Sequence, residues 1–384
     1  MSDCGRGDWR ALYGTSAEAA DYFRACEEAP LETFDYAAAV ASEGGSPVMG
    51  LPTFTGAFRY DMGLSGTARW WTEAIHQRVP KLVALPVYGA GSPHSDELAL
   101  GISPCVACDP ARRAAAFGAL LDSMEAHARS QKIEVVFLKD VTDAQAAWAD
   151  PLLSARGFSR LATLPVAHLP LPFASEEDYV ASLSSNMRSN LRRKLKRAGD
   201  VEVEIRSEAC AIESELAEMR QATQNAAKTN YGDFEDLAPG YYDAVLRALP
   251  DAARLLLYRK GGKLIGFSLV LLDDQRLTYK YTGMRYPEAR DHNLYFINWM
   301  TMVRLCFERG IQHLHAGETT YLTKTRLGCV VERSWIYFKH TNRLVNPLFK
   351  AIGPRIRIDQ MDADVKALGE TMPYVAPDAR DQAV

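Results

Sequence analysis

A strand–helix–strand pattern that occurs twice constrains the fold of this chain more than any other feature. The second copy runs through the apolar residues 311–317, a short segment at 321–328 and the strand-like residues 330–339. The first copy runs through residues 133–138, a helical stretch that ends near Gly157, and the strand-like residues 161–169. Both helical segments end at a glycine, which is common just after a helix. The repeat predicts a duplicated fold of the α/β class with mixed sheets, and polar chemistry at the helix of only one copy.

The length and composition of the chain indicate a globular protein of two domains. It has 384 residues, of which 47% are hydrophobic and 24% charged, and its net charge is −4. We expect an N-terminal domain at 1–170 that is mainly structural, a C-terminal domain at 171–349 that carries the active cleft, and a helix and tail at 350–384. No run approaches the roughly 20 apolar residues that span a bilayer, and no signal peptide is evident, so we expect a cytoplasmic protein without a transmembrane segment.

Between the two copies, the sequence predicts an antiparallel set of strands followed by a long helix. The expected strands are residues 253–259, 263–272 and 276–284, and the first two are joined by a Gly261-Gly262 turn. Residues 294–309 have the pattern of a strong helix that ends at Gly310.

Two stretches, together with this order of elements, carry a resemblance to a known family. The first is the basic segment 184–197, with the sequence SSNMRSNLRRKLKR, and the second is Tyr321-x-x-Lys324-x-x-x-Gly328. On these residues the chain resembles tandem GNAT-like acyltransferases, in particular the Fem-type aminoacyl-transferases and GNAT proteins related to peptidoglycan biosynthesis. The resemblance implies two GNAT-like domains in tandem. It also implies an N-acyltransferase that forms an amide between an activated acyl or aminoacyl donor and a small amine or amino-acid acceptor.

The same resemblance leaves the identity of the donor open. It implies no tightly bound cofactor, and either acyl-CoA or aminoacyl-tRNA as the co-substrate. Users of acetyl-CoA have a glycine-rich turn before the long helix, where backbone N–H groups hold the pyrophosphate. Residues 285–293 read RYPEARDHN and contain no glycine, so side chains and Pro287 hinder a close approach of the backbone. This departure favours aminoacyl-tRNA.

Three residues near the second helix are the predicted catalytic residues. Lys324 takes the place where many GNAT enzymes have a tyrosine that supports the leaving group, and the resemblance implies that it stabilises negative charge; the first copy has Leu153 there. Glu318 is the predicted general base, and Tyr321 opens the same motif. The alternatives are a solvated helix lysine for Lys324 and a helix-capping carboxylate for Glu318.

Aromatic and imidazole side chains on two strands are the predicted substrate-binding residues. Tyr279 and Tyr281 are expected on one face of their strand, with Lys280 on the other, although aromatic packing would also explain them. His315 shares a face with His313 and is expected beside the cleft, unless it is a satisfied core histidine. Because no carboxylate partner is apparent near this pair in the sequence, we predict no metal site.

A basic helix at 186–198 is the predicted contact for an anionic partner. It carries six basic residues and no acidic one, and Arg188, Arg192 and Arg193 are its expected binding residues. Such a stripe suits the phosphates of tRNA, of a nucleotide-linked substrate or of a lipid surface, but a solvated helix face would also explain it. A further alternative for the whole chain is a non-catalytic binding module on a GNAT scaffold, since a fold alone does not establish activity.

Overall fold

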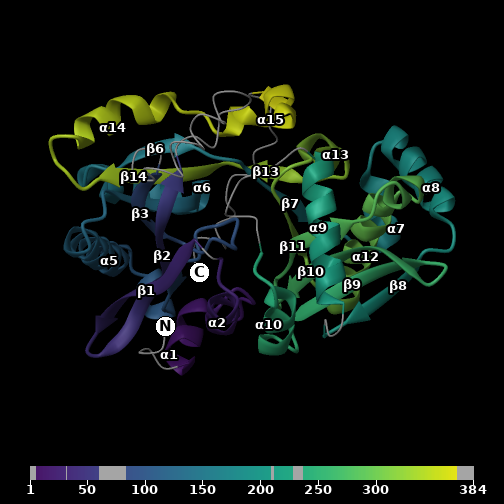
Figure 1. Ribbon diagram of the computed structural model, residues 1–384, viewed down its shortest axis with the longest axis horizontal. Helices are drawn as coiled ribbons and strands as arrows, with labels where there is room; N and C mark the ends of the chain where they lie inside the picture. The colour runs from purple at the N-terminus through teal and green to yellow at the C-terminus, as the bar shows by residue number, and fades with distance from the viewer. Residues whose placement is uncertain (1–5, 32, 60–83, 209–211, 228–236, 370–384) are drawn as a thin grey trace.

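The computed structural model contains two mixed sheets that lie side by side (Figure 1). The structure describes residues 6–31, 33–59, 84–208, 212–227 and 237–369. Most of the predicted C-terminal tail, residues 370–384, lies outside the described residues. In the described part of the chain, no helix combines the length and the apolar character that crossing a bilayer requires.

The first sheet is built mostly from the N-terminal half. Its strands follow the order β1 (Phe34–Glu43), β2 (Ser46–Arg59), β3 (Ala84–Ala90), β5 (Val135–Thr142), β14 (Ser334–His340) and β6 (Ser159–Ala162), with β4 (Gly101–Ile102) paired to β2. The long helix α5 (Pro110–Ser130) begins as expected at a proline, and Asp109 caps it by accepting hydrogen bonds from two backbone N–H groups. A capping box joins Thr142 and Gln145 at the start of α6 (Asp143–Ala155). Apolar residues of α5 and α6 form one core with this sheet.

The second sheet has the order β13 (Val330–Glu332), β7 (Val166–Pro170), β12 (His313–Gly317), β11 (Arg276–Met284), β10 (Lys263–Leu272), β9 (Ala253–Lys260) and β8 (Glu202–Arg206). Helices α7 (Glu176–Ser182), α8 (Ser185–Ala198) and α12 (Leu294–Arg309) share one apolar core with this sheet. Helices α9 (Glu213–Ala227) and α10 (Tyr241–Ala248) pack in a second core. That core also contains α1 (Arg6–Tyr13) and α2 (Ala20–Glu28) from the N-terminal half, so it joins the two halves.

The two sheets exchange one strand in each direction. The predicted strand 161–169 is divided, so that β6 stays in the first sheet and β7 lies between β12 and β13 of the second. The predicted strand 330–339 is divided in the same way, and β14 fills the place between β5 and β6 of the first sheet. Pro165 separates β6 from β7, and proline cannot donate to a ladder of hydrogen bonds. The prediction of a duplicated α/β fold is therefore confirmed. The prediction that residues 161–169 and 330–339 each form one continuous strand is wrong.

The exchange also bears on the predicted domains and on the C-terminal helix. The division of the chain at residue 170 stays a prediction, because the strands do not separate at one point of the sequence. The single helix expected after residue 350 is wrong. The chain instead forms α14 (Asn346–Ile352), two 3-10 turns and α15 (Ala363–Leu368), because Gly353 and Pro354 interrupt a helix here.

Candidate active site

The parallel strands β11 and β12 separate at the candidate site. Their pairing ends with Thr278 opposite His315, after which β11 continues to Met284 and β12 continues to Gly317 paired only with β7. The turn that follows β12 is strained, because Thr319 and Thr320 have φ values of 64° and 50°. Positive φ is rare for a β-branched residue and costs roughly 1–3 kcal/mol, and such strain clusters at functional sites. The strained turn holds Glu318 and leads into α13 (Tyr321–Arg326).

Glu318 and Lys324 lie together at this turn. Burial raises the pKa of Glu318 well above its usual range, and the neighbouring charges of Asp96 and Asp140 add to the effect. The Lys324 side chain is buried at 3% exposure, and its Nζ donates to the carbonyl oxygens of Gly317 at 3.1 Å and Glu318 at 2.6 Å. Burial lowers the pKa of Lys324 to about 8. A lysine ammonium has three N–H donors, so one is left for a bound substrate.

Buried ion pairs connect this region to the N-terminal half. Glu18, just before α2, accepts from Lys280 Nζ at 2.8 Å and from Ser95 Oγ at 2.9 Å, and it pairs with Arg276 at 3.4 Å. The side chains of Lys280 and Glu18 are only 2% and 8% exposed. Although burial alone would raise the pKa of Glu18, the charges of Lys280 and Arg276 lower it. The buried ion pair of Lys280 with Glu18 thereby connects strand β11 to the first half, and burial protects this pair from screening by water.

A β-bulge in β11 corrects the prediction for its two tyrosines. Val270 of β10 is opposite Tyr279, whereas the preceding residue Leu269 is opposite Tyr281, so Lys280 is the extra residue. The bulge breaks the period of two and puts the tyrosines in different cores. The Tyr279 hydroxyl accepts from Asn298 of α12 at 3.0 Å. The Tyr281 hydroxyl lies 3.2 Å from His94 Nδ1, and its ring packs edge-on against Tyr241 of α10. The prediction that Tyr279 and Tyr281 lie on one face of the strand is therefore wrong.

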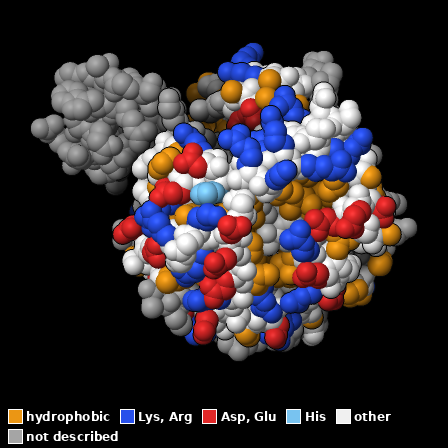
Figure 2. All heavy atoms as spheres, turned by 90° about the vertical axis from the view of Figure 1, so that its right-hand side faces the viewer, with side chains coloured by type: hydrophobic (Ala, Val, Ile, Leu, Met, Phe, Trp, Pro, Cys, Tyr) orange, Lys and Arg blue, Asp and Glu red, His pale blue; other side chains and the backbone are white. Residues whose placement is uncertain are grey.

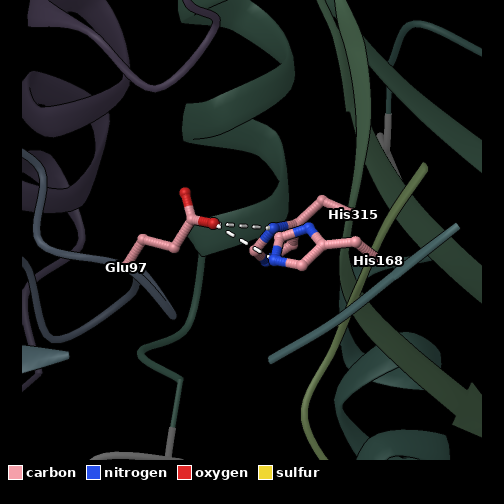
Figure 3. Close-up of side chains that lie close together, drawn as sticks. All are labelled: Glu97, His168 and His315. Carbon is pink, nitrogen blue, oxygen red and sulfur yellow. Dashed lines mark ion pairs between the residues drawn. The ribbon is translucent and has the colours of Figure 1, made fainter. Parts of the chain in front are cut away.

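A cluster of two histidines and a glutamate lies beside the same turn (Figure 3). His168 Nε2 and His315 Nδ1 lie 3.6 Å and 3.4 Å from Glu97 Oε1. Burial acts to lower the pKa of His315, but Glu97 and Asp96 outweigh it and raise the pKa to about 9. For His168, burial and the charge of His315 lower the pKa to about 3.

Two of the predicted site residues have structural contacts. The Tyr321 ring is fully buried, and its hydroxyl donates to the carbonyl oxygen of Pro165 at 2.7 Å. Arg188 donates to the carbonyl oxygen of Ala181 at 2.9 Å and to that of Leu183, so it holds the end of α7. By contrast, Arg192 is exposed on α8. Within the described ranges, none of the six cations on α8 forms an ion pair with an acidic side chain.

Sequence reasoning missed the contribution of the N-terminal half to this site. Asp96 and Glu97 follow β3 in the polar run 92–97, and Asp140 lies on β5 beside Lys139, with which it forms an ion pair. The run SPHSDE, directly after an apolar strand, was the signal available, because polar loops at strand ends carry functional groups. His168 gave no comparable signal, since its role depends on the strand exchange.

Comparisons with known proteins agree with the geometry. Residues 185–322 match the family model described as an acetyltransferase (GNAT) domain. Among solved structures, FemX is 14% identical, with a TM-score of 0.59 over 91% of this chain and 98% of that chain. The C-terminal domain of a putative lysylphosphatidylglycerol synthetase from Agrobacterium fabrum is 13% identical, with a TM-score of 0.51 over 92% and 93% of the two chains. No curated protein matches the sequence.

The chain therefore contains a GNAT acetyltransferase domain. More particularly, its fold is similar to that of FemX over most of the chain, which agrees with the resemblance seen in the sequence. At these levels of identity, the solved structures establish the fold.

The buried pair between Lys280 and Glu18 is expected to stabilise the contact between the two halves. Lys280→Met leaves the Glu18 carboxylate buried with Arg276 as its remaining cation, so the free energy of unfolding should fall by about 3–5 kcal/mol. Urea denaturation followed by circular dichroism measures the change. The matched control is Arg247→Met, which breaks exposed pairs with Asp243 and with Glu28 of α2; the three side chains are 64%, 41% and 51% exposed. This control should change stability by less than about 1 kcal/mol, and equal losses in the two variants would contradict the assignment.

Proposed function

We propose that this protein is an N-acyltransferase whose general base is Glu318. The observation that carries the proposal is the strained turn at the separation of β11 and β12, which holds a carboxylate of raised pKa beside the Lys324 ammonium. A carboxylate whose pKa is raised is a stronger base, which suits it to accept a proton from an amine nucleophile. Tyr321 has no part in this proposal, because its hydroxyl is bonded within the core.

The proposed reaction forms one amide bond. The acceptor nitrogen attacks the carbonyl carbon of the donor, the C–N bond forms, and the bond from that carbon to the leaving oxygen or sulfur breaks. Glu318 takes the proton that the acceptor nitrogen loses. The N–H of Lys324 that makes no bond to Gly317 or Glu318 donates to the oxygen on which negative charge develops.

The donor that this site suits best is an aminoacyl-tRNA. A pocket of about 330 Å³ lies between α8, the start of α12 and α13, and its lining includes Lys194, Tyr295, Thr320 and Arg326. Thr320 belongs to the strained turn and is two residues from Glu318 in the sequence. No side chain caps α12, whose third N–H, that of Phe296, donates to the carbonyl oxygen of Asn293.

The surface around the pocket supports a donor with many phosphates. Figure 2 shows Lys and Arg side chains gathered across the upper part of the face on which α8 lies in Figure 1, beside hydrophobic side chains. The exposed cations Arg192, Arg193, Lys196 and Arg197 extend this positive surface along α8 beyond the pocket. In place of a glycine-rich turn, the β11–α12 connection contains the short helix α11 (Glu288–Asp291). The positive surface extends beyond the pocket, and the connection lacks a glycine-rich phosphate loop. Both features favour tRNA over coenzyme A as the donor.

Replacement of the proposed base tests whether the chain is an enzyme. Glu318→Gln keeps the shape of the side chain but cannot accept a proton, so kcat should fall by about 10²–10⁴-fold. The assay is the transfer of labelled amino acids from total aminoacyl-tRNA to a panel of small amines and amino acids. Glu177→Gln, on the exposed face of α7, should leave the rate unchanged. Equal rates for Glu318→Gln and wild type would contradict the catalytic role. No turnover in any folded form would favour a binding module.

The ammonium of Lys324 predicts how the rate depends on pH. Glu318 must be ionised to accept a proton, so kcat/KM should rise as pH passes through its raised pKa, which Asp96, Asp140, Lys139 and Lys324 influence. Lys324 must be protonated to donate, so kcat/KM should fall as pH rises through its pKa of about 8. Burial lowers this pKa, and the neighbouring Cys329, Asp96, Glu318 and Asp362 oppose the shift. Rates measured over the pH range in which the chain stays folded test both limbs.

Substitutions at Lys324 assign the alkaline limb. Lys324→Arg keeps a positive charge at all these pH values, so whatever activity it retains should lack the fall near pH 8. Lys324→Met should lower kcat by about 10²–10³-fold, the usual effect of removing one donor to the oxyanion. Lys366→Met, on the exposed face of α15, is the control. An unchanged alkaline limb in Lys324→Arg would assign it to another group.

Removal of three exposed cations from α8 tests the donor. In the Arg192→Gln/Arg193→Gln/Lys196→Gln variant, the affinity for aminoacylated tRNA should fall at least tenfold at 50 mM salt, and the slope of log K against log salt should become shallower by about 2–3. Filter binding measures both quantities. The control removes Lys132, Arg343 and Lys350, which are exposed in the part of the chain that packs on the first sheet. Equal losses in the two variants, or thermal stabilisation by coenzyme A alone, would overturn the tRNA assignment.

A further inference from the structure

Two histidine nitrogens between the sheets face one oxygen without forming a hydrogen bond. His168 Nε2 and His315 Nδ1 are each buried and form no hydrogen bond to a described residue, although they lie within ion-pair distance of Glu97 Oε1, at 3.6 Å and 3.4 Å. The His315 side chain is only 3% exposed. A buried polar atom without a partner costs about 1–3 kcal/mol, and two such atoms aimed at one point call for a bound group. The proposed acyl transfer uses neither nitrogen.

The contacts behind these three residues hold them in place. The other ring nitrogen of His315, Nε2, lies 3.4 Å from Asp96 Oδ2, and the other carboxylate oxygen of Glu97 accepts from Arg276 at 2.8 Å. His168 and His315 are directly opposite each other on the antiparallel strands β7 and β12. A carboxylate behind a ligating histidine is the usual support of a metal ligand, because it sets the ring orientation and the tautomer.

We propose that Glu97, His168 and His315 bind one divalent transition-metal ion of the zinc class. Their ligand atoms all lie within 4.8 Å of one another. Around zinc, with bonds of about 2.0–2.1 Å, the ligand atoms of a tetrahedral site are about 3.3 Å apart, close to the 3.4 Å and 3.6 Å found here. Two imidazoles exclude magnesium and calcium as the preferred ions, since both select oxygen ligands.

A second carboxylate is placed to complete the site. Glu332 Oε2 lies 3.6 Å from the same His168 Nε2, and its other oxygen, Oε1, accepts from the backbone N–H of Ala144 at 3.4 Å. Glu332 or a water molecule would be the fourth ligand, as in zinc sites with three protein ligands. The ion would tie the loop that carries Glu97 to the second sheet. It would thereby hold Asp96, the residue before Glu97, close to Glu318.

Metal binding by the purified full chain tests this proposal without any assay of activity. After dialysis against a chelator, zinc is titrated in competition with a chromophoric chelator, and cobalt is added to a second sample. We expect one equivalent of zinc to bind, the melting temperature to rise, and cobalt to give the visible absorption of a tetrahedral complex. His168→Gln and His315→Gln should each weaken zinc binding by on the order of 100-fold or more.

The matched control is His313→Gln. His313 lies on the same strand as His315 and is exposed, so its loss should leave zinc binding unchanged. Absence of stoichiometric zinc binding by the folded wild-type chain would overturn the proposal and leave the cluster as an ion pair of protonated His315. Equal weakening by His313→Gln would also overturn it, because it would indicate adventitious binding. Either result would leave the acyltransferase proposal untouched, since that proposal rests on Glu318 and Lys324.

Discussion

The reciprocal exchange of β7 and β14 is the constraint on which the rest of the structure depends. In the first sheet, β14 from the C-terminal half lies between β5 and β6. In the second sheet, β7 from the N-terminal half lies between β12 and β13. Backbone hydrogen bonds of both sheets are satisfied only when both exchanges occur. Because each half completes the sheet of the other, the surfaces between the sheets are held together and can bury charge. The ion pair of Glu18 with Lys280 depends on this arrangement.

Burial shifts the pKa values of the charged side chains at the candidate site. In a region of low dielectric constant, the pKa of Glu318 rises and that of Lys324 falls to about 8, because burial disfavours the charged form of each group. The backbone strain at Thr319 and Thr320 persists because α13 and β12 determine both ends of the turn. The N-terminal half contributes Asp96 and Asp140 to the surroundings of Glu318, and the division into a structural and a catalytic half stays a prediction.

Elements with strong periodicity were predictable, and features that depend on register were not. The helix 294–309 and the strands at 253–284 agree with α12 and with β9, β10 and β11, because apolar period and glycine turns are local signals. The bulge at Lys280 left no local signal, so the assumption of period two put Tyr279 and Tyr281 on one face. Arg188 looked like the other cations of α8, but its guanidinium reaches the carbonyl groups that end α7. Only the packing of the two helices distinguishes it from Arg192.

The sequence by itself determined the duplicated strand–helix–strand units, the basic helix, and the difference between Lys324 and Leu153 in the two copies. These features rest on residue type and spacing, which the chain carries in one dimension. The tertiary structure alone decided which sheet each strand joins, and therefore which side chains meet. Glu97 and His315 are more than two hundred positions apart in the sequence, and they lie 3.4 Å apart because β7 crosses to the second sheet and brings the halves together. Long-range pairing is chosen by the burial and hydrogen bonding of the whole fold, and local patterns do not encode it.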